Sequence, residues 1–296
     1  MELFWKKNKI LLITLFLLII CVIASLIQYR VYFNGQVEGY NALMELVSKN
    51  PDAYPLKPKK PIIDDTYTLF SRIVVDETLR PIMFVMPFLV MLCGVYTFYS
   101  KLKSGFFKEE CMRRSYKKNV LFNVLDSWKN VIIIPVFLIT MFVGCYIVTG
   151  NFDIYRTNDF HGGTLINEQY LEILPTYCFI YGINLILVGL FFINITLILA
   201  KKNSNLFVTL VQSYLVFIVV NLFTEVLIGC GLENIFPVLI KYNICNSLSI
   251  FNFWVYDHVM SLGFMFLFAF SLFFISTIIV FYRYRNKESV MIEIDK

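Results

Sequence analysis

The chain has 296 residues, of which 58% are hydrophobic and 16% are charged, and it contains 30 phenylalanines. A soluble domain of this length does not need so much apolar surface, so a soluble globular class is excluded. The net charge of +5 is modest and lies near the ends of apolar runs, which does not indicate nucleic-acid binding. The composition predicts an all-α polytopic membrane protein with a single transmembrane domain over residues 1–296.

The first apolar run, residues 10–27, carries no charge and follows three lysines. About 20 apolar residues cross a bilayer, and no small-residue cleavage site follows this run. We therefore expect an anchored first span with the N-terminus in the cytoplasm. Phe4 and Trp5 beside the lysines are typical of an interfacial anchor.

Residues 28–80 are polar, with seven basic and seven acidic side chains, and alternation of sides places them outside the cell. Short amphipathic helices are predicted around 40–47 and 67–75. Four prolines between residues 51 and 61 predict an extended stretch that separates the two helices. The segment is interpreted as a small extracytoplasmic loop domain.

Five further spans are predicted, and Pro87 is expected to bend the first of them. Their ranges are 81–99, 131–148, 174–200, 206–229 and 259–281. Residues 230–258 contain Gly, Pro and several Asn, so they suit half-helices that re-enter the outer leaflet. Of the 26 Lys and Arg residues, 17 lie on the predicted inner side, and both termini are therefore expected in the cytoplasm.

Residues 101–130 form the one long basic segment between two apolar runs, with eight Lys or Arg against three acids. The segment is predicted to be cytoplasmic and helical from about Glu109 onward. Its apolar residues recur at three-four spacing, with Val120 or Leu121 followed by Val124, Leu125 and Trp128. Two interpretations remain: a solvated loop that contacts lipid headgroups, or a docking helix for a cytoplasmic partner.

Catalytic signatures are nearly absent from the sequence. The only histidines, His161 and His258, lie far apart, and no His-Glu-x-x-His or Gly-x-Ser-x-Gly motif occurs. No phosphate-binding loop occurs either, so any ATP hydrolysis would take place on a separate chain. We expect no enzyme activity, no cofactor and no metal. Cys230 and Cys245 both fall near the outer face and could pair, although the sequence favours free thiols.

Glu225 is the one acid inside a predicted span, and an intramembrane carboxylate is a functional hypothesis by default. Structural pairing near the outer end of the span is the favoured interpretation. Other polar residues in spans four and five are expected to form interhelical hydrogen bonds. The alternative is a polar substrate path lined by Glu225, Asn221, Gln212 and Asn184, with Asn194 a further polar residue in span four.

The arrangement resembles the type-two membrane-domain family of ATP-binding-cassette (ABC) transporter permeases. The residues that carry the resemblance are Phe4-Trp5-Lys6-Lys7 at the start, the segment from Gly105 to Lys129, and the Arg114-Ser-Tyr-Lys-Lys stretch followed by Lys129 and Pro135. Residues 230–258 are similar to the re-entrant outer piece of that family. The chain departs from the family's pattern where Lys103-Ser104 precedes the glycine and in the length of its first outer loop.

The resemblance implies a permease subunit that pairs with a second permease subunit and with a cytoplasmic ABC ATPase. It implies a coupling helix between spans two and three, and export of a peptide, drug or lipid-like substrate. Phe106 and Phe107 are expected as an exposed aromatic pair at the tip of this helix, surrounded by a polar rim. The coupling residues are Gly105, Phe106, Phe107, Glu109, Glu110, Arg113 and Arg114.

Two rival functions come from other classes. The first is a non-transporting membrane receptor or immunity protein that binds a peptide through residues 28–80. The second is an integral membrane enzyme, which the missing acid-base and metal motifs disfavour. The Lys-, Asn-, Ile- and Phe-rich usage is typical of an AT-rich Gram-positive bacterium, so we expect a multi-pass protein of a bacterial plasma membrane.

Overall fold

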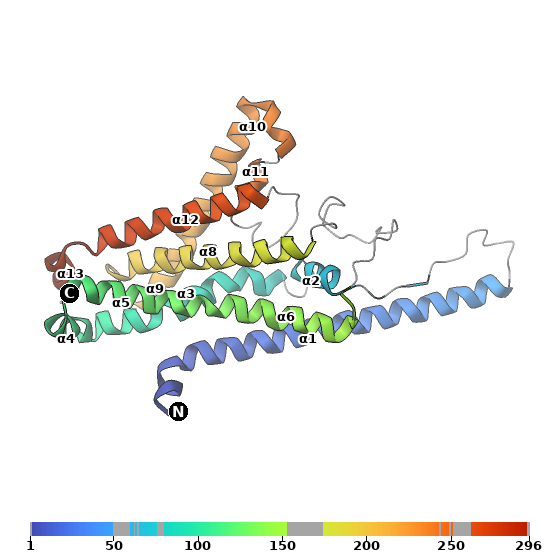
Figure 1. Ribbon diagram of the computed structural model, residues 1–296, viewed down its shortest axis with the longest axis horizontal. Helices are drawn as coiled ribbons and strands as arrows, with labels where there is room; N and C mark the ends of the chain where they lie inside the picture. The colour runs from blue at the N-terminus through green and yellow to red at the C-terminus, as the bar shows by residue number, and fades with distance from the viewer. Residues whose placement is uncertain are drawn as a thin grey trace.

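The computed structural model describes residues 2–49, 60–61, 63, 65–75, 80–152, 174–242, 244–248, 250 and 262–294 (Figure 1). Within these ranges the chain forms helices and no strand. The long helices are α1 (Glu2–Lys49), α3 (Arg80–Lys103), α6 (Ile133–Thr149), α8 (Leu174–Ala200), α9 (Leu206–Leu222) and α12 (Leu262–Arg283). Six helical stretches are long and apolar enough to cross a membrane, which confirms a multi-pass membrane protein.

Shorter elements connect the long helices. They are α2 (Thr66–Val75), α4 (Phe106–Arg113), α5 (Tyr116–Lys129), the 3-10 helix η2 (Asn130–Ile132), the π-helix η3 (Phe223–Cys230), α10 (Gly231–Ile235), the 3-10 helix η4 (Pro237–Tyr242), α11 (Ile244–Ser247) and α13 (Lys287–Ile294). The predicted fourth span coincides with α8, and the helix expected near 67–75 is present as α2. Helix α13 was not predicted from the sequence.

The first outer loop begins differently from the expectation. A separate helix at 40–47 is wrong, because α1 continues without interruption from the first span to Lys49. Asn50-Pro51 follows directly, and a residue before proline is disfavoured in the α conformation, so the helix ends there. The half of α1 beyond the first span therefore extends past the rest of the bundle (Figure 1).

Helix α8 lies at the centre of the bundle and contacts α3, α6, α9 and α12. Two-thirds of its most apolar stretch is buried, against about a quarter for the corresponding stretches of α1, α9 and α12. Small residues permit its close packing: a Cβ on Gly94 of α3 would lie 2.5 Å from Ile193 of α8, and one on Gly189 would collide with Ile134 of α6.

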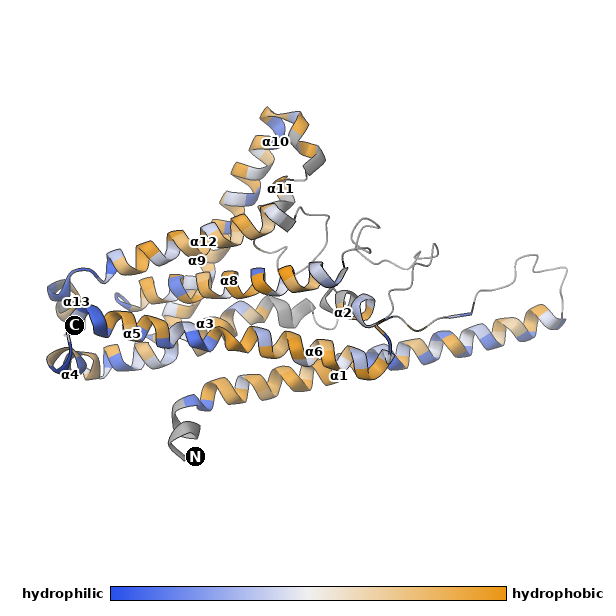
Figure 2. Ribbon diagram, viewed as in Figure 1, coloured by the Kyte–Doolittle hydropathy of each residue, from blue (hydrophilic) through white to orange (hydrophobic). Residues whose placement is uncertain are grey.

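The two ends of the bundle differ in character. Helices α4 and α13 lie together at one end, toward which both chain termini also point, whereas α2 and the extension of α1 lie at the other (Figure 1). Hydrophilic residues gather in α4, in α13 and at the start of α5, while the middle of the bundle is hydrophobic (Figure 2). This pattern is the one expected of helices that cross a bilayer and end in water.

Candidate functional site

The basic segment folds as two helices rather than one. Gly105 adopts a left-handed backbone conformation with φ of 75° and begins α4. The helix ends where Arg114 becomes extended, and α5 begins after Ser115. A single helix from Glu109 is therefore wrong. The segment is a hairpin of α4 and α5, and α5 runs through η2 directly into α6.

A polar network ties this hairpin to the preceding span. The Lys101 ammonium of α3 lies 3.0 Å from Glu110 of α4 and donates a hydrogen bond of 2.9 Å to Asn123 of α5. Asn123 in turn donates to the second Glu110 oxygen, at 3.2 Å. The Lys101 and Glu110 side chains retain about a quarter of their exposure, so water screens their attraction only in part. Three helices thus meet at one partly buried ion pair.

Phe107 forms the apolar centre of the hairpin. Its side chain is fully buried, with ring centroids 5.6 Å from Phe98 and 6.3 Å from Tyr116. The expected exposed aromatic pair is therefore wrong for Phe107, because this ring packs inward and only Phe106, at 44% exposed, faces outward. Tyr116 also donates a hydrogen bond of 2.8 Å to the carbonyl of Tyr284, at the end of α12.

The outer surface of α4 carries the other predicted coupling residues. Glu109, Arg113 and Arg114 are exposed, whereas Glu110 points into the network with Lys101. Met112 is 77% exposed, and it belongs to none of the sequence motifs considered above. The hairpin therefore presents Phe106 and Met112 as exposed apolar side chains among charges of both signs.

Cys111 lies on the inner side of α4 at 8% exposed. Burial raises the pKa of its thiol, while a hydrogen bond from Asn119 and the charge of Lys287 oppose that effect and Glu110 adds to it. The net result is a thiol that stays protonated above its ordinary range. Cys111 is thus a buried packing residue and not a reactive nucleophile.

Helix α5 is also fastened to the middle of the bundle. The Trp128 indole donates to Asn194 of α8 at 2.8 Å, and the Asn194 amide donates to Ser276 and Thr277 of α12, both at 3.0 Å. The predicted stripe is correct for Val120 and Val124, which are buried, but Leu121 and Leu125 are exposed. Polar Asn119, Asn123 and Ser127 complete the buried face instead. The expectation of interhelical hydrogen bonds is confirmed for Asn194.

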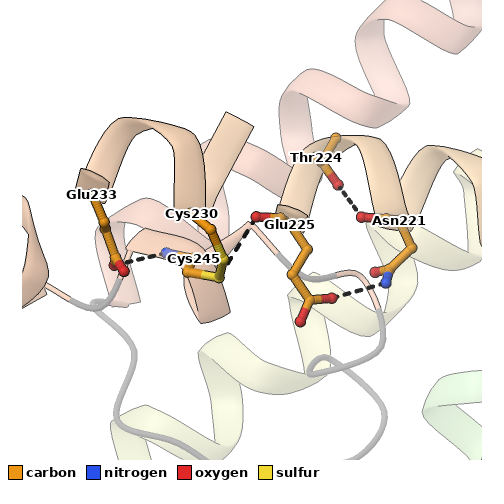
Figure 3. Close-up of a disulfide and its surroundings, with 6 residues drawn as sticks. All are labelled: Asn221, Thr224, Glu225, Cys230, Glu233 and Cys245. Carbon is orange, nitrogen blue, oxygen red and sulfur yellow. Dashed lines mark hydrogen bonds between the residues drawn. A yellow bond between two sulfur atoms is a disulfide. The ribbon is translucent and has the colours of Figure 1, made fainter. Parts of the chain in front are cut away.

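At the other end of the bundle, Glu225 lies in the π-helix η3 (Figure 3). Its carboxylate accepts a hydrogen bond of 2.9 Å from Asn221, one turn earlier. The Asn221 side-chain oxygen accepts a bond from the backbone of Ile250. Glu225 thus has a hydrogen-bond partner one turn away, as structural pairing would require, and its place in a substrate path stays a prediction. Glu233 accepts a further bond of 2.9 Å from the backbone of Cys245.

Cys230 and Cys245 form a disulfide, so the expectation of free thiols is wrong for this pair (Figure 3). The other five cysteines are free. Short helices between the two residues fold the chain back onto η3, which sequence spacing alone does not reveal. The Cys245 sulfur lies 3.6 Å from the carbonyl of Glu225, and as part of a disulfide it carries no proton, so this is a packing contact.

The four predicted path residues do not form one cluster. Asn221 and Glu225 are paired, whereas Gln212 accepts a bond of 2.7 Å from Asn203 in the turn before α9. About 20 Å of helix separates Gln212 from Glu225, since an α-helix rises about 1.5 Å per residue. Asn184 is fully buried in α8, and neither its amide nitrogen nor its oxygen has a hydrogen-bond partner among the described residues.

No group of three His, Cys, Asp or Glu side chains that could hold a metal is found in the described ranges. His161 and His258 lie outside those ranges. Comparison of the chain with protein-family models, curated proteins and solved structures finds no match. The function therefore has to be argued from the residues and their geometry.

Proposed function

We propose that this chain is the membrane-spanning permease subunit of an ABC transporter, which exports a peptide, drug or lipid-like substrate. A separate cytoplasmic ATPase drives it, and a second permease subunit completes the path. The observation that carries the proposal is the α4–α5 hairpin. It presents exposed Phe106 and Met112 at the basic end of the bundle and is joined to α3, α8 and α12 behind that surface.

The orientation has two independent supports. Clustered Lys and Arg favour the cytoplasmic side, which places α4 and α5 inside the cell. Disulfides persist in oxidising compartments, which supports an outer location for Cys230 and Cys245. Helices α4 and α11 lie toward opposite ends of the bundle (Figure 1), and Cys245 belongs to α11, so the two arguments agree. In this proposed orientation both termini are cytoplasmic, and the described part of the expected re-entrant segment, from Cys230 to Ile250, faces the outer leaflet.

The hairpin has the physical properties that docking requires. An exposed apolar pair supplies contact area, and charges of both signs at Glu109, Arg113 and Arg114 fix register. A partner that moved α4 would move three spans, because Glu110, Tyr116 and Trp128 connect the hairpin to α3, α12 and α8 respectively. In the substrate path we retain Asn221 and Glu225 as the polar pair.

The test is purification of the tagged protein from its native membrane, with mass spectrometry of the co-purified chains. Wild type is compared with a double variant, Phe106→Ala and Met112→Ala. The matched control is Ile235→Ala with Phe236→Ala, which removes two exposed apolar side chains at the outer end.

An ABC ATPase that is lost only from the hairpin variant supports both the function and the docking surface. An ATPase that both variants retain overturns the docking surface alone. If intact wild type brings no ATPase, the receptor or immunity alternative is preferred. The specific observation in favour of that alternative is the part of α1 that extends outside the bundle and could contact a peptide.

A further inference from the structure

The outer half of α1 extends beyond the helices on which α1 packs, which are α6 and α3. Packing of α1 on α6 involves Val22 and Leu26, which lie against Gly144, and α6 ends five residues later at Thr149. Residues 31–49 continue beyond this contact as helix, for about 28 Å at about 1.5 Å per residue. Figure 1 shows this part of α1 extending past α2 and α6. Its polar side-chain contacts are within the helix, such as Glu45 with Lys49 at 2.7 Å.

Such a helix is not expected to be stable in water without a partner. Side-chain packing, rather than intrinsic propensity, supplies most helical stability in proteins. Gly35 and Gly39 lie within it, and each glycine costs about 1 kcal/mol relative to alanine in a helix interior. The outer half of α1 therefore needs a surface against which to pack.

The sequence of this half carries an apolar seam at coiled-coil spacing. The seam residues are separated by four, three, four and three positions, and they are Phe33, Val37, Tyr40, Met44 and Val47. Alternating spacings of three and four keep side chains on the face that two helices share when they wind around each other. All five are partly buried, whereas the other residues between 34 and 49 are exposed.

The positions that flank this seam are free of charge. In a parallel pair of helices, the residues beside the seam face each other across the interface and repel when they carry like charges. Here those positions are Asn34, Gln36, Asn41, Leu43 and Ser48. The charged residues Glu38, Glu45 and Lys49 lie away from the seam. Two identical helices can therefore approach without electrostatic repulsion.

The membrane fixes how two copies would meet. Every copy of the chain crosses the bilayer in the same direction, so the outer halves of α1 are parallel and start at the same height. Each seam residue of one copy then lies opposite the same residue of the other copy. Anchoring in one membrane plane also raises the effective concentration of the two helices, so a short seam suffices.

We propose that residues 33–47 of α1 bind the same residues of a second copy of this chain as a short parallel coiled coil outside the membrane. This identifies an identical chain as the second subunit in the proposed function. It rests on the proposed orientation of the spans and is independent of whether an ATPase docks at α4.

The test is disulfide cross-linking of single-cysteine variants in native membranes. Met44→Cys places a thiol in the seam, and Ala42→Cys places one at nearly the same height on the opposite face. A disulfide requires Cβ atoms within about 4 Å, so we expect Met44→Cys to form a covalent dimer about tenfold faster than Ala42→Cys. Equal rates, or no dimer with Met44→Cys, overturn the proposal.

A charge placed in the seam gives a second, independent readout. Val37→Glu is added to Met44→Cys. It places two like charges opposite each other in the seam, about two helical turns from the thiol, and should slow cross-linking about tenfold. Ala42→Glu in the same background adds the same charge on the outward face and should leave the rate unchanged. If both charges act equally, the seam does not pair. Co-purification of an ATPase with a variant that no longer cross-links would leave the proposed function standing.

Discussion

The α4–α5 hairpin and the segment from η3 to Ile250 lie toward opposite ends of the bundle and are held by different contacts. Hairpin residues Glu110, Tyr116 and Trp128 bond to α3, α12 and α8. In the outer segment, the disulfide and the Glu233 bond stay within residues 223–250, and the bond from Ile250 to Asn221 joins the segment to the end of α9.

The two regions therefore differ in how directly a movement in them is passed to the spanning helices. A hairpin that is bonded to three spans transmits a displacement to them. The outer segment is linked mainly within itself and joins the bundle through the end of α9, so we expect a change in it to reach α9 first. We therefore place the mechanical connection of the proposed transporter at the hairpin, and we regard residues 231–250 as a cover over Asn221 and Glu225.

The largest effect is expected from loss of the disulfide. A closed loop of about 15 residues contributes about 3 kcal/mol in the chain-entropy model, and Cys230 and Cys245 are 15 positions apart. Replacement of both by serine should increase hydrogen exchange in 223–250 while leaving 106–129 unchanged. A comparable increase in the hairpin would show that the two ends are not independent.

Asn194→Leu should have the next largest effect. The substitution removes the acceptor of Trp128 and the donor to Ser276 and Thr277. Interhelical hydrogen bonds in membranes contribute about 0.6 kcal/mol each on average, so a loss of about 1–2 kcal/mol in the free energy of unfolding is expected.

The matched control for that variant is Asn184→Leu in the same helix. Asn184 is equally buried but has no hydrogen-bond partner among the described residues. Removal of an unsatisfied polar group should be neutral or stabilising. Equilibrium unfolding in mixed micelles measures both variants, and equal destabilisation would contradict this account of the α8 polar residues.

The ion pair in the hairpin should contribute less. A double-mutant cycle of Lys101→Met and Glu110→Gln should give a coupling of about 0.5–1 kcal/mol, because the pair is only partly buried. Exposed Glu109→Gln, paired with Lys101→Met, should give no coupling. A coupling as large for Glu109 as for Glu110 would mean that the charges act at long range and do not tie α3 to α4.

The smallest change concerns the chemistry of Cys111 rather than stability. Its raised pKa means that the reactive thiolate forms at higher pH than in an unfolded chain. Alkylation by a maleimide should thus be slow near neutral pH and should rise only at more alkaline pH. Exposed Ser115→Cys, in a Cys111→Ser background, should react faster at every pH.

The raised pKa of Cys111 also affects stability. The neutral thiol stabilises the fold below its unfolded pKa of 9.0, and this contribution is lost as pH rises above that value.

The sequence predicted the spanning helices well and the contacts between them poorly. Long apolar runs bounded by charge define spans such as α8 without knowledge of neighbours. The inward side of Phe107 and the pairing of Cys230 with Cys245 depend on how the chain turns, at Arg114 and through α10 and α11. Likewise, Asn184, Gln212 and Glu225 were predicted to line one path because all three are polar and lie in predicted spans. Helix packing decides which side chains meet, and the sequence does not show it.

The most direct test of the central claim is a photo-cross-linking amino acid at Met112, the most exposed apolar position of α4. The same probe at Ile147, which is equally exposed on α6 toward the outer end, serves as the control. The account predicts that Met112 captures a chain with the phosphate-binding motif of an ABC ATPase and that Ile147 does not. Capture of no ATPase at Met112, in membranes where the protein is intact, would contradict the assignment of the hairpin as the coupling element.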